Sequence, residues 1–134
     1  GYCLSDDRTL LAAMAEEGPP WPVSQLAQQA GISALQYAPD WPFRVRQQLE
    51  EERRYLSQEL SRLRFHVYPS DSNFLLFQGE EGWRERLLDR GILIRSCADF
   101  QGLGPGFYRV CVRSRGENKR LIQAIQQERE AFHG

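Results

Sequence analysis

Arginines stand at the edges of two short apolar runs, ILIRSC (92–97) and FYRVCVR (107–113). Arg95 lies toward the end of the first run, and in the second Arg109 opens the stretch RVCVR that Arg113 closes. Guanidinium groups bind carboxylate and phosphate through paired hydrogen bonds, so two of them on one rigid sheet would suit a small dianionic ligand. The alternative is a one-sided antiparallel sheet that presents its arginines to water. Spacing alone favours this simpler alternative.

The run at 107–113 is expected to be a strand with two unlike faces, because side chains alternate across a strand. One face would carry the apolar residues that suit packing against helices, namely Tyr108, Val110 and Val112. The other face would carry Arg109, Cys111 and Arg113. Arg95, at the end of a neighbouring strand, could join this polar face.

The first part of the chain is expected to be helical. Residues 2–4 read as a short strand, and Asp6 or Asp7 can cap a helix over about 8–16. A proline-rich break separates it from an alanine-rich helix at 23–35, which Gly31 could interrupt. The stretch YAPDWP (37–42) marks the most plausible boundary, which divides the chain into 1–38 and 39–134.

The second part of the chain alternates helices and strands. A helix over about 41–64 carries an apolar stripe at spacings of three and four, made of Val45, Leu49, Leu56, Leu60 and Leu63. Strands are expected at about 73–78, 92–97 and 107–113, with a short helix before Gly91. Ser114 and Glu117 form a capping box for a last helix to about 132. This helix would bury Leu121, Ile122, Ile125 and Phe132. The pattern predicts an α+β fold, a small sheet of about three strands covered by helices on one face.

Composition excludes several classes of function. A formal net charge of −1 creates no general attraction to nucleic acid or to an anionic membrane, and no apolar run is long enough for a membrane span. His66 and His133 are too isolated to suggest a metal site. The three cysteines are widely spaced, which indicates reduced thiols in a cytoplasmic protein.

Four segments together resemble the C-terminal part of the fold-type I pyridoxal-phosphate enzymes. They are GPPWPVSQLAQQAG, SDSNFLLF, RGILIRSCADFQGLG and YRVCVRSRGENKRLIQAI, and the resemblance covers nearly all 134 residues in order. The similar branch contains the histidinol-phosphate aminotransferases and the threonine-phosphate decarboxylases of cobalamin synthesis. The segment IRSCADFQGLGPGFYRVCVR favours the decarboxylases, because the aminotransferases usually have a small residue in place of Arg113.

The resemblance implies roles for matching positions. Arg109 corresponds to the arginine that grips the substrate α-carboxylate, and Arg95 to one that helps hold the substrate phosphate. Asn73 matches a position near the carboxylate end, although a purely structural amide fits equally well. Arg113 receives no role. Tyr2 matches a tyrosine that follows the arginine holding the cofactor phosphate, and that arginine would precede Gly1.

The resemblance also implies that the reaction centre lies elsewhere. Pyridoxal-phosphate chemistry needs a lysine that binds the cofactor, and Lys119, the only lysine, sits in the first turn of a polar helix. The chain is therefore expected to be the C-terminal third of such an enzyme, with no cofactor and no activity of its own. The parent would be a homodimer that binds a phosphorylated amino acid. Residues 1–38 would be the end of the large domain with its connecting helices, and residues 39–134 the C-terminal small domain. In the parent, residues 1–38, including Trp21, Val23 and Leu26, would pack against the large domain and the second subunit; in the isolated chain they could self-associate.

Two other functions remain open at this point. The parent could be an aminotransferase acting on histidinol phosphate or a similar amino acid, with the same arginines. The chain could also be a freestanding α+β binding module with no catalytic parent. Carbon dioxide release, compared with amino transfer to 2-oxoglutarate, would separate the two enzymes. The gene sequence upstream of Gly1 would show whether the chain is a freestanding module or part of a longer enzyme.

Overall fold

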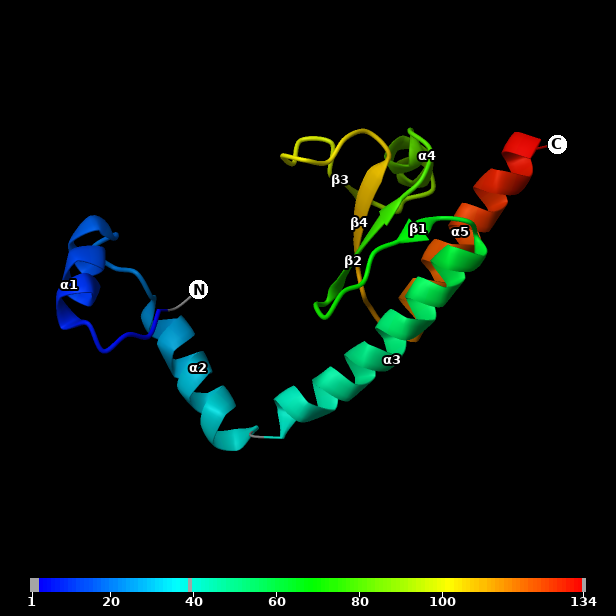
Figure 1. The fold of residues 1–134 in the computed structure, drawn as a ribbon. Helices are drawn as coiled ribbons and strands as arrows, with labels where there is room; N and C mark the ends of the chain where they lie inside the picture. Colours follow the sequence, from blue (N-terminus) through cyan, green and yellow to red (C-terminus); the bar gives the residue numbers. More distant parts are fainter. Residues whose placement is uncertain (1–2, 39, 134) are drawn as a thin grey trace. The chain divides into compact units, whose positions relative to one another are not determined.

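A computed structural model describes residues 3–38 and 40–133, with the side chains of the last two helical positions left aside (Figure 1). The fold is α+β, as predicted, and the chain divides into two compact units, Gly1–Trp41 and Pro42–Gly134. Its helices are α1 (Arg8–Glu17), α2 (Gln25–Tyr37), α3 (Trp41–Arg62), α4 (Trp83–Asp89) and α5 (Arg115–His133). Its strands are β1 (His66–Val67), β2 (Phe74–Gln78), β3 (Arg95–Ser96) and β4 (Phe107–Cys111).

The first unit contains α1 and α2, both begun by side-chain caps. The Asp7 carboxylate accepts hydrogen bonds from the backbone N–H groups of Thr9 and Leu10, each at 3.0 Å. Ser24 caps α2 in the same manner, and Gly31 does not interrupt that helix. The predicted strand at 2–4 is wrong for residues 3 and 4, which pair with no described strand. Tyr2 lies outside the described residues.

No side chain of α1 or α2 is buried. Trp21 is 90% exposed and Leu26 is 83% exposed, while Val23 is about half exposed. Apolar side chains of this size normally find a partner surface. The assignment of residues 1–38 to the end of a large domain stays a prediction.

In the second unit, α3 supplies part of the core. Leu56 and Leu60 are fully buried, and Leu49 and Leu63 pack against them at the edge of the core. Val45, which the stripe also predicted, remains exposed near the start of the helix. The helix ends at Arg62, two residues before Arg64 takes a φ of 59° that no α-helix continues through.

The sheet has four antiparallel strands in the order β1-β2-β4-β3, one more than predicted. The added strand is β1, which pairs His66 with Gln78 and Val67 with Phe77 of β2. It has only two residues, so no alternating pattern marks it in the sequence. β3 is also shorter than the predicted 92–97, because only Arg95 and Ser96 pair with β4.

One face of the sheet is covered and the other is open. Tyr108, Val110 and Val112 are buried, whereas Arg109 is half-buried and Cys111 is exposed, which confirms the predicted alternation. Helices α3 and α5 lie on the same side of the sheet (Figure 1). The buried residues of β2, β4 and these helices form one core cluster. The face that carries Arg109 is therefore the open one.

The last helix begins as predicted. The hydroxyl of Ser114 donates to the Glu117 carboxylate at 2.6 Å. This hydrogen bond and the one from Arg113 lower the pKa of Glu117 below its ordinary value. Leu121, Ile122 and Ile125 are buried, as the pattern indicated. The expected burial of Phe132 concerns a side chain outside those described.

Two buried polar residues, missed in the sequence, fasten α5 to α3. Asn118 is 2% exposed; its amide nitrogen donates to the carbonyl of Arg113 at 2.8 Å and to the carboxylate of Glu52 at 3.0 Å. Its amide oxygen accepts from the backbone N–H of Arg113 at 3.1 Å. Glu52 is 8% exposed, and its two carboxylate oxygens share the Nε–H of Arg115, at 2.8 and 3.0 Å. This network holds the turn between β4 and α5.

A glycine just before β4 gives a testable prediction. Gly106 has a φ of 86°, and a Cβ there would meet the carbonyl oxygen of Gly79 at 2.5 Å. Gly106→Ala is expected to lower the free energy of unfolding by about 3 kcal/mol, from backbone strain and overpacking together. The matched control is Gly102→Ala, because Gly102 has a φ of 84° but open space around it. It should cost only about 1 kcal/mol in urea denaturation, and equal costs would contradict the role of the Gly79 contact.

Candidate anion-binding site

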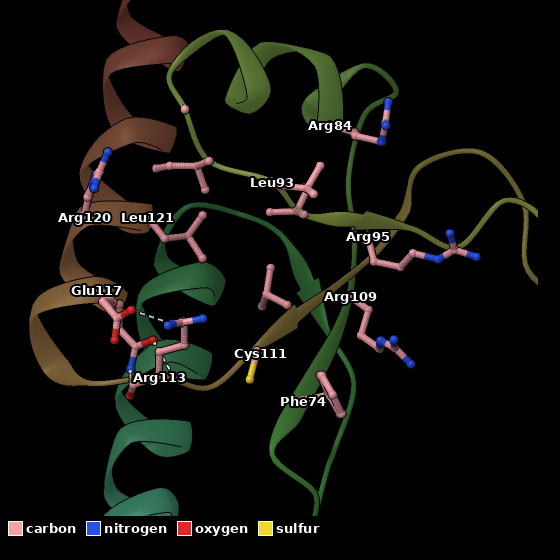
Figure 2. A pocket seen from close by; sticks show the side chains of 15 residues that line it. Phe74, Arg84, Leu93, Arg95, Arg109, Cys111, Arg113, Glu117, Arg120 and Leu121 are labelled. Atoms are coloured by element: carbon pink, nitrogen blue, oxygen red, sulfur yellow. Dashed lines mark hydrogen bonds and ion pairs between the residues drawn. The ribbon is translucent and has the colours of Figure 1, made fainter.

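The structure brings Arg95 and Arg109 together. They are direct partners across β3 and β4, so their side chains leave the sheet on the same face. Figure 2 shows both projecting to the same side, away from α3 and α5. Like charges directly opposite each other in a sheet are destabilising, and a bound anion would relieve that repulsion.

A pocket of about 540 Å³ adjoins these arginines. Its lining is rich in cations, with Arg84, Arg95, Arg109, Arg113 and Arg120 against the single carboxylate of Glu117. Its apolar lining comes mainly from the segment 91–94, joined by Phe74, Val110 and Leu121. The volume falls in the usual range of small-molecule sites, about 300–1,000 Å³. The pocket therefore suits a small anionic ligand.

The pocket arginines differ in their counter-ions. Arg95 pairs with Asp99 at 2.6 Å, and Arg113 pairs with Glu117 at 2.6 Å. For Arg109, no carboxylate within the described ranges 3–38 and 40–133 lies at ion-pair distance. Its guanidinium carbon instead lies 4.5 Å from the ring centroid of Phe74. Arg109 is thus a half-buried arginine with no described carboxylate to balance its charge.

Asn73 is placed differently from the two arginines. It lies one residue before β2 with an exposed side chain, and it does not line the pocket. Its backbone carbonyl accepts the N–H of Val112 at 2.8 Å, which extends the pairing of β2 with β4. The structure thus gives Asn73 a backbone role at the strand end. Its predicted part in ligand binding stays a prediction.

Sequence reasoning missed Phe74 and Asp99 as neighbours of the arginines. Phe74 could have been found, because the alternation in FLLFQ places it on the open face of β2. Asp99 follows β3 in an irregular turn, where no periodicity indicates direction. Two cysteines near these arginines also differ. Burial raises the pKa of the thiol of Cys97, which follows β3, whereas Cys111, the last residue of β4, is exposed.

That this chain holds no pyridoxal phosphate of its own stays a prediction, and the position of its lysine bears on it. Lys119, the only lysine, is exposed on α5 and does not line the pocket. In the part of the chain that the structure describes, no three His, Cys, Asp or Glu side chains gather as a metal site would require. The described helices include none whose length and apolar character would allow it to cross a membrane. What the pocket can do chemically is bind and orient an anion.

The geometry and the sequence agree with one class of protein. The family described as aminotransferase class I and II matches residues 1–125, and the chain belongs to that family. Threonine-phosphate decarboxylase of Salmonella typhimurium is 38% identical over 130 residues, 94% of this chain and 35% of the relative. Histidinol-phosphate aminotransferase of Methanoculleus marisnigri is 39% identical over 88 residues, 62% of this chain and 25% of the relative.

Solved structures show the same fold. The histidinol-phosphate aminotransferase of Clostridium acetobutylicum superposes with a TM-score of 0.85 at 22% identity, covering 95% of this chain and 40% of that one. The L-threonine-O-3-phosphate decarboxylase of Porphyromonas gingivalis gives 0.78 at 23% identity, covering 92% and 40%. The chain spans about a third or less of the length of the curated relatives reported above.

Proposed function

We propose that this chain is the C-terminal third of a pyridoxal-phosphate-dependent threonine-phosphate decarboxylase of cobalamin synthesis. The observation that carries the proposal is the pair Arg95 and Arg109, which stand directly opposite each other on the open face of the sheet. The Salmonella relative, a threonine-phosphate decarboxylase by name, supports it because the similarity extends over 94% of this chain.

In this proposal the chain binds and orients the substrate. Arg109 holds the α-carboxylate that is lost as carbon dioxide, and Arg95 holds the phosphate at the other end. Asn73 is proposed to stand near the carboxylate end, with a purely structural amide as the alternative. Fixing both ends of a small molecule uses binding energy to orient it, which can lower the activation barrier by several kcal/mol.

The cofactor and the lysine that binds it belong to the remainder of the enzyme. Lys119, exposed and outside the pocket, is not a candidate for that lysine. The 134-residue chain alone is therefore inactive. The exposed apolar residues of its first unit, Trp21 and Leu26 among them, pack in the parent against the large domain and a second subunit.

A histidinol-phosphate aminotransferase is the second candidate. The Methanoculleus relative favours it, with 39% identity over a shorter stretch of the chain. Histidinol phosphate also carries a phosphate group that an arginine can hold. In histidinol phosphate the phosphate ester stands on the carbon that is a carboxylate in an α-amino acid, so the same arginines would serve, with Arg109 facing a phosphate ester and not a carboxylate.

The product of the full-length gene separates the candidates. With pyridoxal phosphate and L-threonine O-3-phosphate, carbon dioxide release is the expected result. With histidinol phosphate and 2-oxoglutarate, glutamate should not form faster than without enzyme. Glutamate formation without carbon dioxide release would reject the decarboxylase in favour of the aminotransferase. An upstream reading frame without a lysine-bearing domain would reject both enzymes in favour of a freestanding binding module.

A further inference from the structure

The two arginines of the open face are equivalent in backbone pairing but not in environment. Arg95 is exposed and forms an ion pair with Asp99, which neutralises its charge. Arg109 is half-buried, and its guanidinium lies over the ring of Phe74. The face of an aromatic ring attracts a cation but carries no net charge, so this contact holds the guanidinium without neutralising it.

The strand register explains why Phe74 and not another side chain makes this contact. Leu76 lies directly opposite Arg109, whereas Phe74 lies opposite Cys111. Phe74 is therefore a diagonal neighbour of Arg109 on the same face, within reach of aromatic and long side chains. Figure 2 shows Phe74 beside the path of the Arg109 side chain.

We propose that Phe74 is the positioning residue for Arg109, an inference that rests on the proposed role of Arg109 in gripping the substrate carboxylate. A free arginine side chain samples many rotamers, and ordering them costs binding free energy. Stacking on Phe74 fixes the guanidinium before the ligand arrives. The charge remains available, because the partner is a ring and not a carboxylate.

The test is a titration of the ¹⁵N-labelled 134-residue chain with L-threonine O-3-phosphate, followed at the Nε–Hε resonance of Arg109. Phe74→Leu is expected to raise the Kd about three- to tenfold, and Phe74→Tyr, which keeps the ring, to stay within about twofold. The matched control is Phe107→Leu. Phe107 is a half-buried phenylalanine on the same face that stacks on Tyr68 at 6.0 Å, and its loss should leave the Kd within about twofold.

Several outcomes would overturn the inference. They are an unchanged Kd in Phe74→Leu, an equal loss in Phe107→Leu, a failure of tyrosine to restore binding, and no response of Arg109 in the unaltered chain. If Phe74→Leu loses the dispersed backbone spectrum of a folded chain, Phe74→Met replaces it, because methionine fills similar space without a ring.

Failure of this inference is distinguishable from failure of the proposed function. Binding that depends on Phe74, in a full-length enzyme that releases no carbon dioxide, would reject the decarboxylase and keep the positioning role. Carbon dioxide release, together with a Kd that does not change when Phe74 is replaced, would keep the decarboxylase and reject the positioning role of Phe74.

Discussion

Arg109→Ala in the full-length enzyme is expected to lower kcat/KM about a hundred- to a thousandfold, which corresponds to roughly 3–4 kcal/mol of transition-state stabilisation. Under the proposed function, the variant would lose a charge-assisted, paired contact to the carboxylate that leaves. No carboxylate among the described residues forms an ion pair with Arg109. Replacing Arg109 therefore breaks no internal ion pair, and the change in kcat/KM reports its contact with the substrate. Steady-state decarboxylation measures the effect.

Two further variants sharpen this result. Arg109→Lys keeps the positive charge but lacks the planar fork, so it should recover only part of the loss. Arg54→Ala removes an exposed arginine of α3 that pairs with Glu50 at 3.3 Å, and it should leave kcat/KM unchanged. A kcat/KM within a fewfold of wild type for Arg109→Ala would reject the substrate-gripping role.

Asn118→Leu is expected to lower the free energy of unfolding by about 3 kcal/mol. The leucine fills nearly the same space but provides none of the three hydrogen bonds that the amide makes to Arg113 and Glu52. It leaves the backbone N–H of Arg113 without its side-chain partner and one carboxylate oxygen of Glu52 with fewer donors. Urea denaturation of the 134-residue chain measures the change.

The control for Asn118→Leu is the same kind of change on the solvent side of α5. Gln123 is exposed, so Gln123→Leu should alter the unfolding free energy by no more than about 0.5 kcal/mol. Equal midpoints for the two variants would show that the buried amide contributes nothing specific. A lower midpoint for Asn118→Leu alone would support the network as the anchor of the turn after β4.

Local patterns were enough to predict most of the helices. The cap at Asp7, the stripe that includes Leu56 and Leu60, and the Ser114–Glu117 capping box each act within a few residues of one another. Such signals survive without knowledge of the fold, because the interacting groups are neighbours along the chain. The strand candidate failed at residues 3 and 4, which have no described partner strand.

Local sequence patterns predicted the strands of the sheet only in part. The alternation at Tyr108–Val112 predicted which face is buried, but β1 was missed and β3 is shorter than its apolar run. A strand of two residues forms because a partner strand pairs with it. Its own sequence is too short to show an alternating pattern. Glu52 and Asn118 were missed for the same reason, since they lie 66 positions apart and meet only in the fold.

By itself the sequence determined the residue types of the site: arginines among the apolar residues of two short runs, and a single lysine on a polar helix. Only the tertiary structure decided that Arg95 stands opposite Arg109, that Asp99 neutralises the first, and that Phe74 stacks on the second. Strand register depends on hydrogen bonds between segments distant in sequence, and a shift of one residue would turn these side chains to the other face.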